Sequence, residues 1–124
     1  EDVLREADFV SLHCPGGEAN RHLIDGERLD LMKPGAFLIN TARGEVVDEA
    51  ALADRLEAGR LGGAGLDVFE DEPRINAKLF GLDNVVLAPH LGSATGQTRD
   101  AMGAKALENL RAFFAGETPP DRVV

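Results

Sequence analysis

Four short apolar segments, separated by stretches with helical periodicity, constrain this chain more than any other feature of its sequence. The segments are residues 9–12, 36–39, 62–68 and 85–88. The run 36–39 is apolar at every position, which is typical of a strand buried on both faces of a parallel sheet. Strands that alternate with helices through short connections favour right-handed crossovers. The sequence therefore predicts an α/β fold with a parallel sheet.

The helical stretches have recognisable ends. Asp48 is a candidate N-cap for a helix with Leu52 and Leu56 on its apolar face, and Gly59 is a candidate stop. A short helix is expected over residues 27–32. A long helix is expected over about residues 95–115, with apolar residues at helical spacing: Met102, Ala106, Leu110 and Phe113.

Composition excludes several classes of protein. The chain has 124 residues, 44% of them hydrophobic, which suffices for a soluble domain with a sizeable core. A formal net charge of −9 argues against a nucleic-acid partner. No run approaches the roughly 20 apolar residues that a membrane helix needs, so no membrane partner is expected. The single cysteine, Cys14, excludes an internal disulfide and a cysteine-rich zinc site. Together with a first segment unlike a signal peptide, this favours a cytoplasmic protein with no metal site.

Ligands of open parallel sheets bind at the carboxyl ends of the strands. That rule selects four segments, residues 13–17, 40–44, 67–73 and 89–93. Three of them contain a residue with notable chemistry: Arg43, Glu72 and His90. The four segments together predict a binding site at one edge of the sheet.

Each of these three residues also has an ordinary structural interpretation. Arg43 could hold a substrate carboxylate through two parallel hydrogen bonds, or it could cap the sheet or pair with a nearby acid. Glu72 lies in an acidic loop of the kind that is usually solvated, although Pro73 restricts its backbone to extended conformations. His90 could be structural, or it could exchange protons near neutral pH with Glu72 as its partner.

Taken together, the segments resemble the D-isomer-specific 2-hydroxyacid dehydrogenase family, and within it the glyoxylate/hydroxypyruvate reductases. The resemblance covers nearly the whole chain and rests on four blocks in the family's order and spacing: residues 7–15, 32–48, 65–73 and 89–93. It implies the C-terminal half of a Rossmann-like NAD(P)-binding domain, followed by a C-terminal helix. It implies an oxidoreductase that reduces 2-keto acids, glyoxylate or hydroxypyruvate above all, to D-2-hydroxy acids with NAD or NADP.

The resemblance also implies a role for each residue. Arg43 would bind the substrate's carboxylate and keto oxygen, His90 would protonate that oxygen as hydride arrives, and Glu72 would raise the proton affinity of His90. Asp67 would hold the nicotinamide carboxamide. The other residues expected to contact the cofactor are Cys14, Thr41, Ala42, Gly92 and Ser93. Hydride addition builds negative charge on oxygen, which an imidazolium and a guanidinium can stabilise.

One part of the family's pattern is missing. The cofactor domain of the family opens with a strand, a G-x-G-x-x-G loop and a helix, and this sequence contains no such unit. We therefore expect a C-terminal fragment, inactive by itself. Residues 1–93 would form the second half of the cofactor domain, and residues 94–124 would form the helix and tail that return toward the substrate domain.

Two other hypotheses remain at this stage. Dinucleotide-sensing corepressors share this fold and the same three residues, so the chain could come from a sensor. It could also be a non-catalytic module that forms oligomers. Half of a Rossmann sheet leaves an unpaired edge strand, which is a template for association, so a homo-oligomer, most simply a dimer, is expected.

Overall fold

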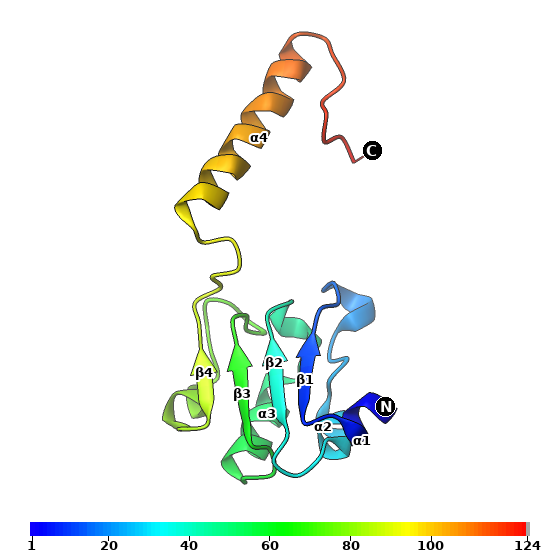
Figure 1. The fold of residues 1–124 in the computed structure, drawn as a ribbon, viewed down its shortest axis with the longest axis vertical. Coiled ribbons are helices and arrows are strands. Elements are labelled where there is room, and N and C mark those ends of the chain that lie inside the picture. The colour runs from blue at the N-terminus through cyan, green and yellow to red at the C-terminus, as the bar shows by residue number, and fades with distance from the viewer. Residues whose placement is uncertain (124) are drawn as a thin grey trace. The chain divides into compact units, whose positions relative to one another are not determined.

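The structure is a computed structural model and describes residues 1–123. They form two compact units, residues 1–90 and residues 91–123. The first unit contains one sheet, and the second contains one long helix (Figure 1). Within the described residues, no helix combines the length and the apolar character needed to cross a membrane.

The sheet has four parallel strands in the order β1-β2-β3-β4. Their bounds are Phe9–Leu12, Phe37–Asn40, Gly63–Leu66 and Val85–Leu87. Every carboxyl end therefore lies at one edge of the sheet (Figure 1). The α/β fold with a parallel sheet is confirmed, and each strand lies within two residues of its predicted segment.

One helix of the first unit precedes the first strand, and the other helices and turns lie between the strands. The helices are α1 (Asp2–Glu6), α2 (Gly26–Leu31) and α3 (Glu49–Glu57), and the 3₁₀ turns are η1 (Glu18–Asn20), η2 (Gly44–Val46) and η3 (Ala77–Gly81). The Asp48 side chain caps α3 by accepting from Ala51 N at 2.9 Å, as predicted. Gly59 follows the helix with φ +66°, a left-handed conformation that glycine adopts without strain.

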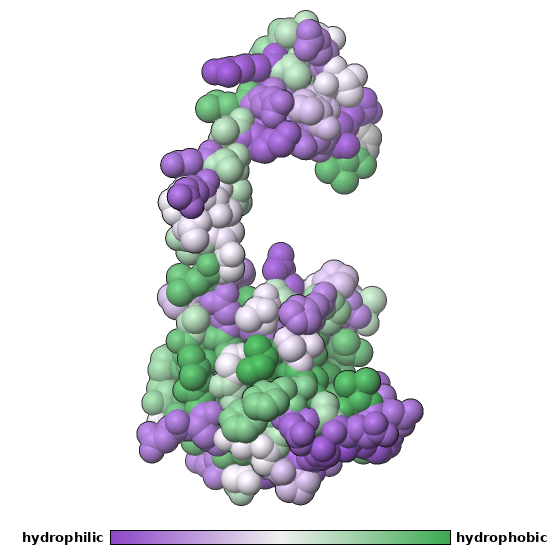
Figure 2. Space-filling model, in the orientation of Figure 1, coloured by the Kyte–Doolittle hydropathy of each residue, from purple (hydrophilic) through white to green (hydrophobic). Residues whose placement is uncertain are grey.

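The two faces of the sheet differ. On the face covered by helices, Val10, Leu38 and Ala64 form one row across the strands and are 6%, 0% and 5% exposed. On the other face Phe9 and Phe37 stack at 5.1 Å between ring centroids, yet they remain 68% and 38% exposed. Figure 2 shows apolar side chains gathered over the strands on this open side. The prediction that residues 36–39 are buried on both faces is therefore wrong within the first unit, because no element of residues 1–90 covers the second face.

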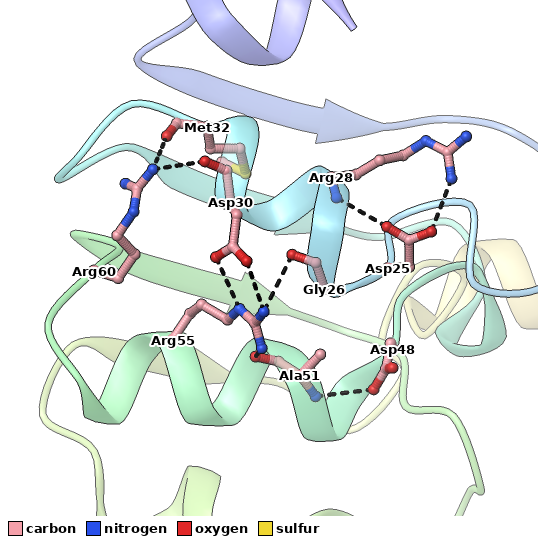
Figure 3. A network of polar contacts seen from close by, with 9 residues as sticks. All are labelled: Asp25, Gly26, Arg28, Asp30, Met32, Asp48, Ala51, Arg55 and Arg60. Atoms are coloured by element: carbon pink, nitrogen blue, oxygen red, sulfur yellow. Dashed lines mark hydrogen bonds and ion pairs between the residues drawn. The ribbon is translucent and has the colours of Figure 1, made fainter.

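Helices α2 and α3 are joined by a network of charged groups (Figure 3). Arg55 of α3 donates to both carboxylate oxygens of Asp30, at 3.1 and 2.9 Å, and to the Gly26 carbonyl at 3.3 Å. Arg60 donates to the backbone carbonyls of Asp30 and Met32. These contacts fix the helices over the buried face, and so they fix the strands whose ends form the candidate site.

The second unit consists of α4 (Gly96–Phe114) and the tail that follows it. Thr95 caps the helix by accepting from Thr98 N at 3.2 Å, which confirms the start and length predicted from the sequence. Asn109 bonds twice to Asp121, so the tail folds back along the helix. The apolar residues predicted to share a face of α4 are largely exposed: Met102 (58%), Leu110 (52%) and Phe113 (64%).

Candidate active site

A hydrogen bond between Glu72 and His90 is the central contact at the carboxyl edge of the sheet. Oε2 of Glu72 lies 2.8 Å from Nδ1 of His90. An ionised carboxylate only accepts hydrogen bonds, so Nδ1 is the donor. Nε2 is then the ring nitrogen at which a proton can be exchanged.

The backbone fixes both partners of this pair. Glu72 lies in the loop after β3, and its Oε1 accepts from the Phe69 N–H at 3.0 Å. Its peptide bond to Pro73 is cis. His90 follows β4 with φ +56°, in the left-handed region that residues other than glycine seldom occupy. Such a conformation persists where the surrounding structure holds it, and it is often found at functional sites.

The charges around Glu72 keep it ionised. The hydrogen bond from His90 is the main cause that lowers the pKa of Glu72, against the opposing effect of partial burial. The Phe69 N–H and the positive charges of His90 and Arg43 lower the same pKa further. Arg43 therefore lies within electrostatic range of the pair, and the three residues selected from separate segments share one region.

Arg43 is exposed and is presented by a tight turn after β2. The buried Asn40, 1% exposed, accepts from Ala42 N at 3.0 Å and donates to the Arg43 carbonyl at 2.9 Å. Arg43 itself donates to the Ala42 carbonyl at 2.7 Å. Asn40 was not among the functional residues predicted from the sequence, although a lone amide at the end of an apolar strand is the signal that could have shown its role.

Gly44 joins this turn to the Glu72 loop. A Cβ at position 44 would lie 1.9 Å from the backbone carbonyl carbon of Phe69, so only glycine permits the two backbones to touch. The segment that presents Arg43 and the segment that presents Glu72 thus pack directly on one another. This contact is the physical reason that residues far apart in the sequence reach the same place.

The predicted cofactor residues fall into three groups. A shallow hollow at the ends of β1 and β2 is lined by Cys14, Thr41 and Ala42 together with His13, Pro15, Gly16 and Arg43. Asp67 lies at the end of β3, is 9% exposed, and donates its N–H to the Asn40 carbonyl at 3.0 Å. Gly92 and Ser93 belong to the second unit and lie before α4. The first unit thus contains all of the predicted cofactor residues except these last two.

The hollow is open, and Gly16, Ala42 and Thr41 give parts of its lining little side-chain bulk. Its position at the carboxyl ends of two parallel strands is where such sheets bind cofactors. Among the described residues there is no cluster of histidine, cysteine and acidic side chains that could hold a metal ion.

Comparisons with known proteins identify the family of the chain. Residues 1–92 match the family model of the D-isomer specific 2-hydroxyacid dehydrogenase, NAD binding domain. The chain belongs to this family. The glyoxylate reductase of Thermococcus litoralis is 54% identical over 123 residues, which cover 99% of this chain and 37% of that protein. The chain thus spans about 37% of the length of this relative.

Solved structures show the same relationship. The TT0316 protein from Thermus thermophilus superposes with a TM-score of 0.94 at 48% identity, over 99% of this chain and 40% of that one. The NADPH-dependent glyoxylate/hydroxypyruvate reductase from Sinorhizobium meliloti, in complex with NADP and malonate, has a TM-score of 0.87 at 39% identity. That match covers 91% of this chain and 35% of the other. The Rossmann-like assignment and the resemblance found in the sequence are confirmed.

Proposed function

We propose that the intact protein reduces 2-keto acids to D-2-hydroxy acids with NADH or NADPH, with glyoxylate or hydroxypyruvate as the preferred substrate. The observation that supports it most is the 2.8 Å hydrogen bond between Glu72 and His90, with the charge of Arg43 close enough to act on the same carboxylate. Membership of the family and the 54% identity to a glyoxylate reductase support the same choice.

In this proposal Arg43 binds the substrate. Its guanidinium is charged at any relevant pH and can hold a carboxylate through two parallel hydrogen bonds. The exposed position of Arg43 leaves it accessible to such a ligand, and the Asn40 turn sets the direction in which it leaves the sheet. A 2-keto acid held in this way presents its keto oxygen beside the same guanidinium.

His90 transfers the proton. The bound nicotinamide supplies the hydride when it is present, and the substrate's oxygen gains negative charge as the carbonyl is reduced. The His90 Nε2 proton is donated to that oxygen, while the ionised Glu72 stabilises the imidazolium through Nδ1. In the oxidation direction His90 accepts the proton from the hydroxyl group.

The cofactor is held at the edge of the sheet. Asp67 would accept a hydrogen bond from the carboxamide. The backbone around Cys14, Thr41 and Ala42 would line the ring's binding place, and Gly92 and Ser93 would be further cofactor contacts. We further propose that residues 1–93 form the second half of the cofactor domain. Residues 94–124 would be the helix and tail that return toward the substrate domain.

The setting we propose is a cytoplasmic homodimer. The exposed apolar residues Phe9, Phe37 and Val86 on the open sheet face support association with a further protein surface. The single cysteine, Cys14, is suited to a reducing compartment. Sedimentation equilibrium of the intact protein tests the dimer, and a single species with the monomer mass would contradict it.

The activity is tested by following the absorbance of NADH and NADPH during incubation of the intact protein with glyoxylate or hydroxypyruvate. We expect saturable oxidation of one cofactor and formation of the D-hydroxy acid, identified by chiral chromatography. Saturable dinucleotide binding without turnover of any 2-keto acid would contradict the proposal and favour a sensor.

A further inference from the structure

Glu49 is a buried acidic residue that neither the sequence motifs nor the proposed chemistry uses. It is 9% exposed and lies in the first turn of α3. Its Oε2 accepts from the Glu70 N–H at 3.0 Å, and its Oε1 accepts from the Asn76 N–H at 2.6 Å. One carboxylate therefore holds both ends of residues 70–76, the loop that contains Glu72.

The support for Glu49 is rigid. Helix α3 is capped by Asp48, and Leu52 and Leu56 on the same helix are 1% and 2% exposed. A carboxylate in the first turn of a helix is also stabilised by the helix dipole. Glu49 is thus a fixed point in the core from which the more exposed loop is held.

The loop has a second attachment on its outer side. The Glu70 carboxylate contacts Arg21 at 2.8 Å and His22 at 2.6 Å, with side chains that are 49% and 33% exposed. The Glu70 side chain is only 23% exposed, so this second attachment is also partly buried. Hydrogen bonds from backbone N–H groups to a carboxylate are stronger than neutral ones and leave a penalty when they are removed. Glu49 differs from Glu70 in that it accepts from the backbone at both ends of the loop.

We propose that Glu49 is a positioning residue for the Glu72–His90 pair. It touches neither partner. It holds the backbone on both sides of Glu72, so that Oε1 of Glu72 meets the Phe69 N–H and Oε2 meets Nδ1 of His90. The consequence for catalysis rests on the proposed function, whereas the consequence for the geometry of Glu72 does not.

The test compares Glu49→Gln and Glu49→Ala with the matched control Glu57→Gln. Glu57 is on the same helix but 59% exposed, paired with Lys78 at the surface. A glutamine at position 49 keeps the side-chain length of glutamate and one oxygen that can accept a hydrogen bond. Glu49→Gln should therefore perturb the loop less than Glu49→Ala. The first readout is the titration of the Glu72 carboxyl carbon by NMR, with exchange rates of the Glu70 and Asn76 amides measured in parallel.

We expect the pKa of Glu72, which the His90 contact lowers, to rise toward its ordinary value in both Glu49 variants and to stay unchanged in the control. The Glu70 and Asn76 amides should exchange faster, while amides of β2 keep their protection. An unchanged Glu72 titration in Glu49→Gln together with faster exchange at those two amides would overturn the proposal, because the loop would have loosened without moving Glu72. If the Glu49→Ala variant does not fold, the titration and amide exchange of Glu49→Gln alone test the proposal.

Kinetics of the intact protein give the second readout. If Glu49 positions the pair, kcat should fall on the order of tenfold to a hundredfold in Glu49→Ala, with little change in KM for the 2-keto acid. A fall in thermal stability with unchanged kcat would mean a structural role only. Absence of activity in the wild type would contradict the proposed function, but the NMR result would still decide the role of Glu49.

Discussion

Two groups of charged contacts can be compared: the network between α2 and α3, and the Glu72–His90 pair at the carboxyl edge. Both contain a hydrogen bond to a carboxylate, but the first suits a structural role and the second suits proton transfer. In the first, Arg55 grips both oxygens of Asp30, and this hydrogen bond is the main reason that the pKa of Asp30 is lowered and that of Arg55 is raised (Figure 3). In the second, His90 contacts Glu72. An arginine–aspartate pair keeps both charges at every physiological pH, whereas a histidine can gain or lose its proton.

The difference shows how a charged contact can be assigned to structure or to chemistry. The first network joins two helices over the buried face of the sheet and also uses backbone carbonyls as acceptors. The second lies at the carboxyl edge of the sheet, where the charge of Arg43 also acts on Glu72. If the comparison is right, changes in the first network lower stability, and changes in the second lower activity.

The largest effect is expected for His90→Asn. Loss of the proton donor should lower kcat by about 10²–10⁴-fold, while dinucleotide binding and the thermal midpoint change little. Stopped-flow or steady-state assays of the intact protein, with fluorescence titration of NADH, separate the two quantities. Retention of more than half of the wild-type kcat would remove His90 from the chemistry.

Arg43→Lys should have the next largest effect. Lysine keeps the charge but cannot make two parallel hydrogen bonds, so kcat/KM for the 2-keto acid should fall by roughly tenfold to a hundredfold. Arg28→Lys is the matched control, because Arg28 pairs with Asp25 on α2, away from the carboxyl edge. Equal kinetics of the two variants would show that Arg43 does not bind substrate.

Glu72→Gln should lower kcat by a smaller factor than His90→Asn, because the imidazole loses the carboxylate that orients it for proton transfer. The folded-state pKa of Glu72 is lowered, so its contribution to stability is present above the ordinary carboxyl pKa and is lost as pH falls through the lowered value. The variant should therefore show a shallower loss of thermal midpoint below about pH 4. A pH dependence of the thermal midpoint identical to that of the wild type would contradict the pairing.

The smallest effect is expected for Arg55→Gln. The bidentate contact with Asp30 is partly solvated, with Arg55 26% and Asp30 55% exposed, so the thermal midpoint should fall slightly. Because the pair is accessible to ions, the difference from wild type should shrink at high salt. Thermal unfolding by circular dichroism at two salt concentrations measures this. A large loss of kcat without loss of stability would mean that the α2–α3 network is not merely structural.

Much of the fold and part of the site could be predicted from the sequence for identifiable reasons. The apolar runs, the Asp48 cap and the Gly59 stop are local signals, and each corresponds to an observed element. Arg43, Glu72 and His90 were selected because strand ends of a parallel sheet meet at one edge, and the 2.8 Å contact between Glu72 and His90 shows that two of them do meet.

Other features depend on contacts that no local pattern reveals. The role of Glu49 depends on backbone amides that lie 21 and 27 residues away in the sequence. Judged from the sequence alone, Glu49 resembles an ordinary acidic residue in the first turn of a helix. Likewise Gly44 is constrained only by the approach of Phe69. The exposure of Phe37 was missed because an apolar run predicts burial without revealing which surface covers each face of the strand.

The central claim is that Glu72 and His90 act as one unit in proton transfer, and a double-mutant cycle on kcat tests it most directly. The four proteins are wild type, Glu72→Gln, His90→Asn and the double variant, assayed with one 2-keto acid at saturating cofactor. Residues that act as a unit give strongly non-additive losses. We predict that the double variant is no slower than His90→Asn alone. A loss equal to the product of the two single losses would contradict the claim.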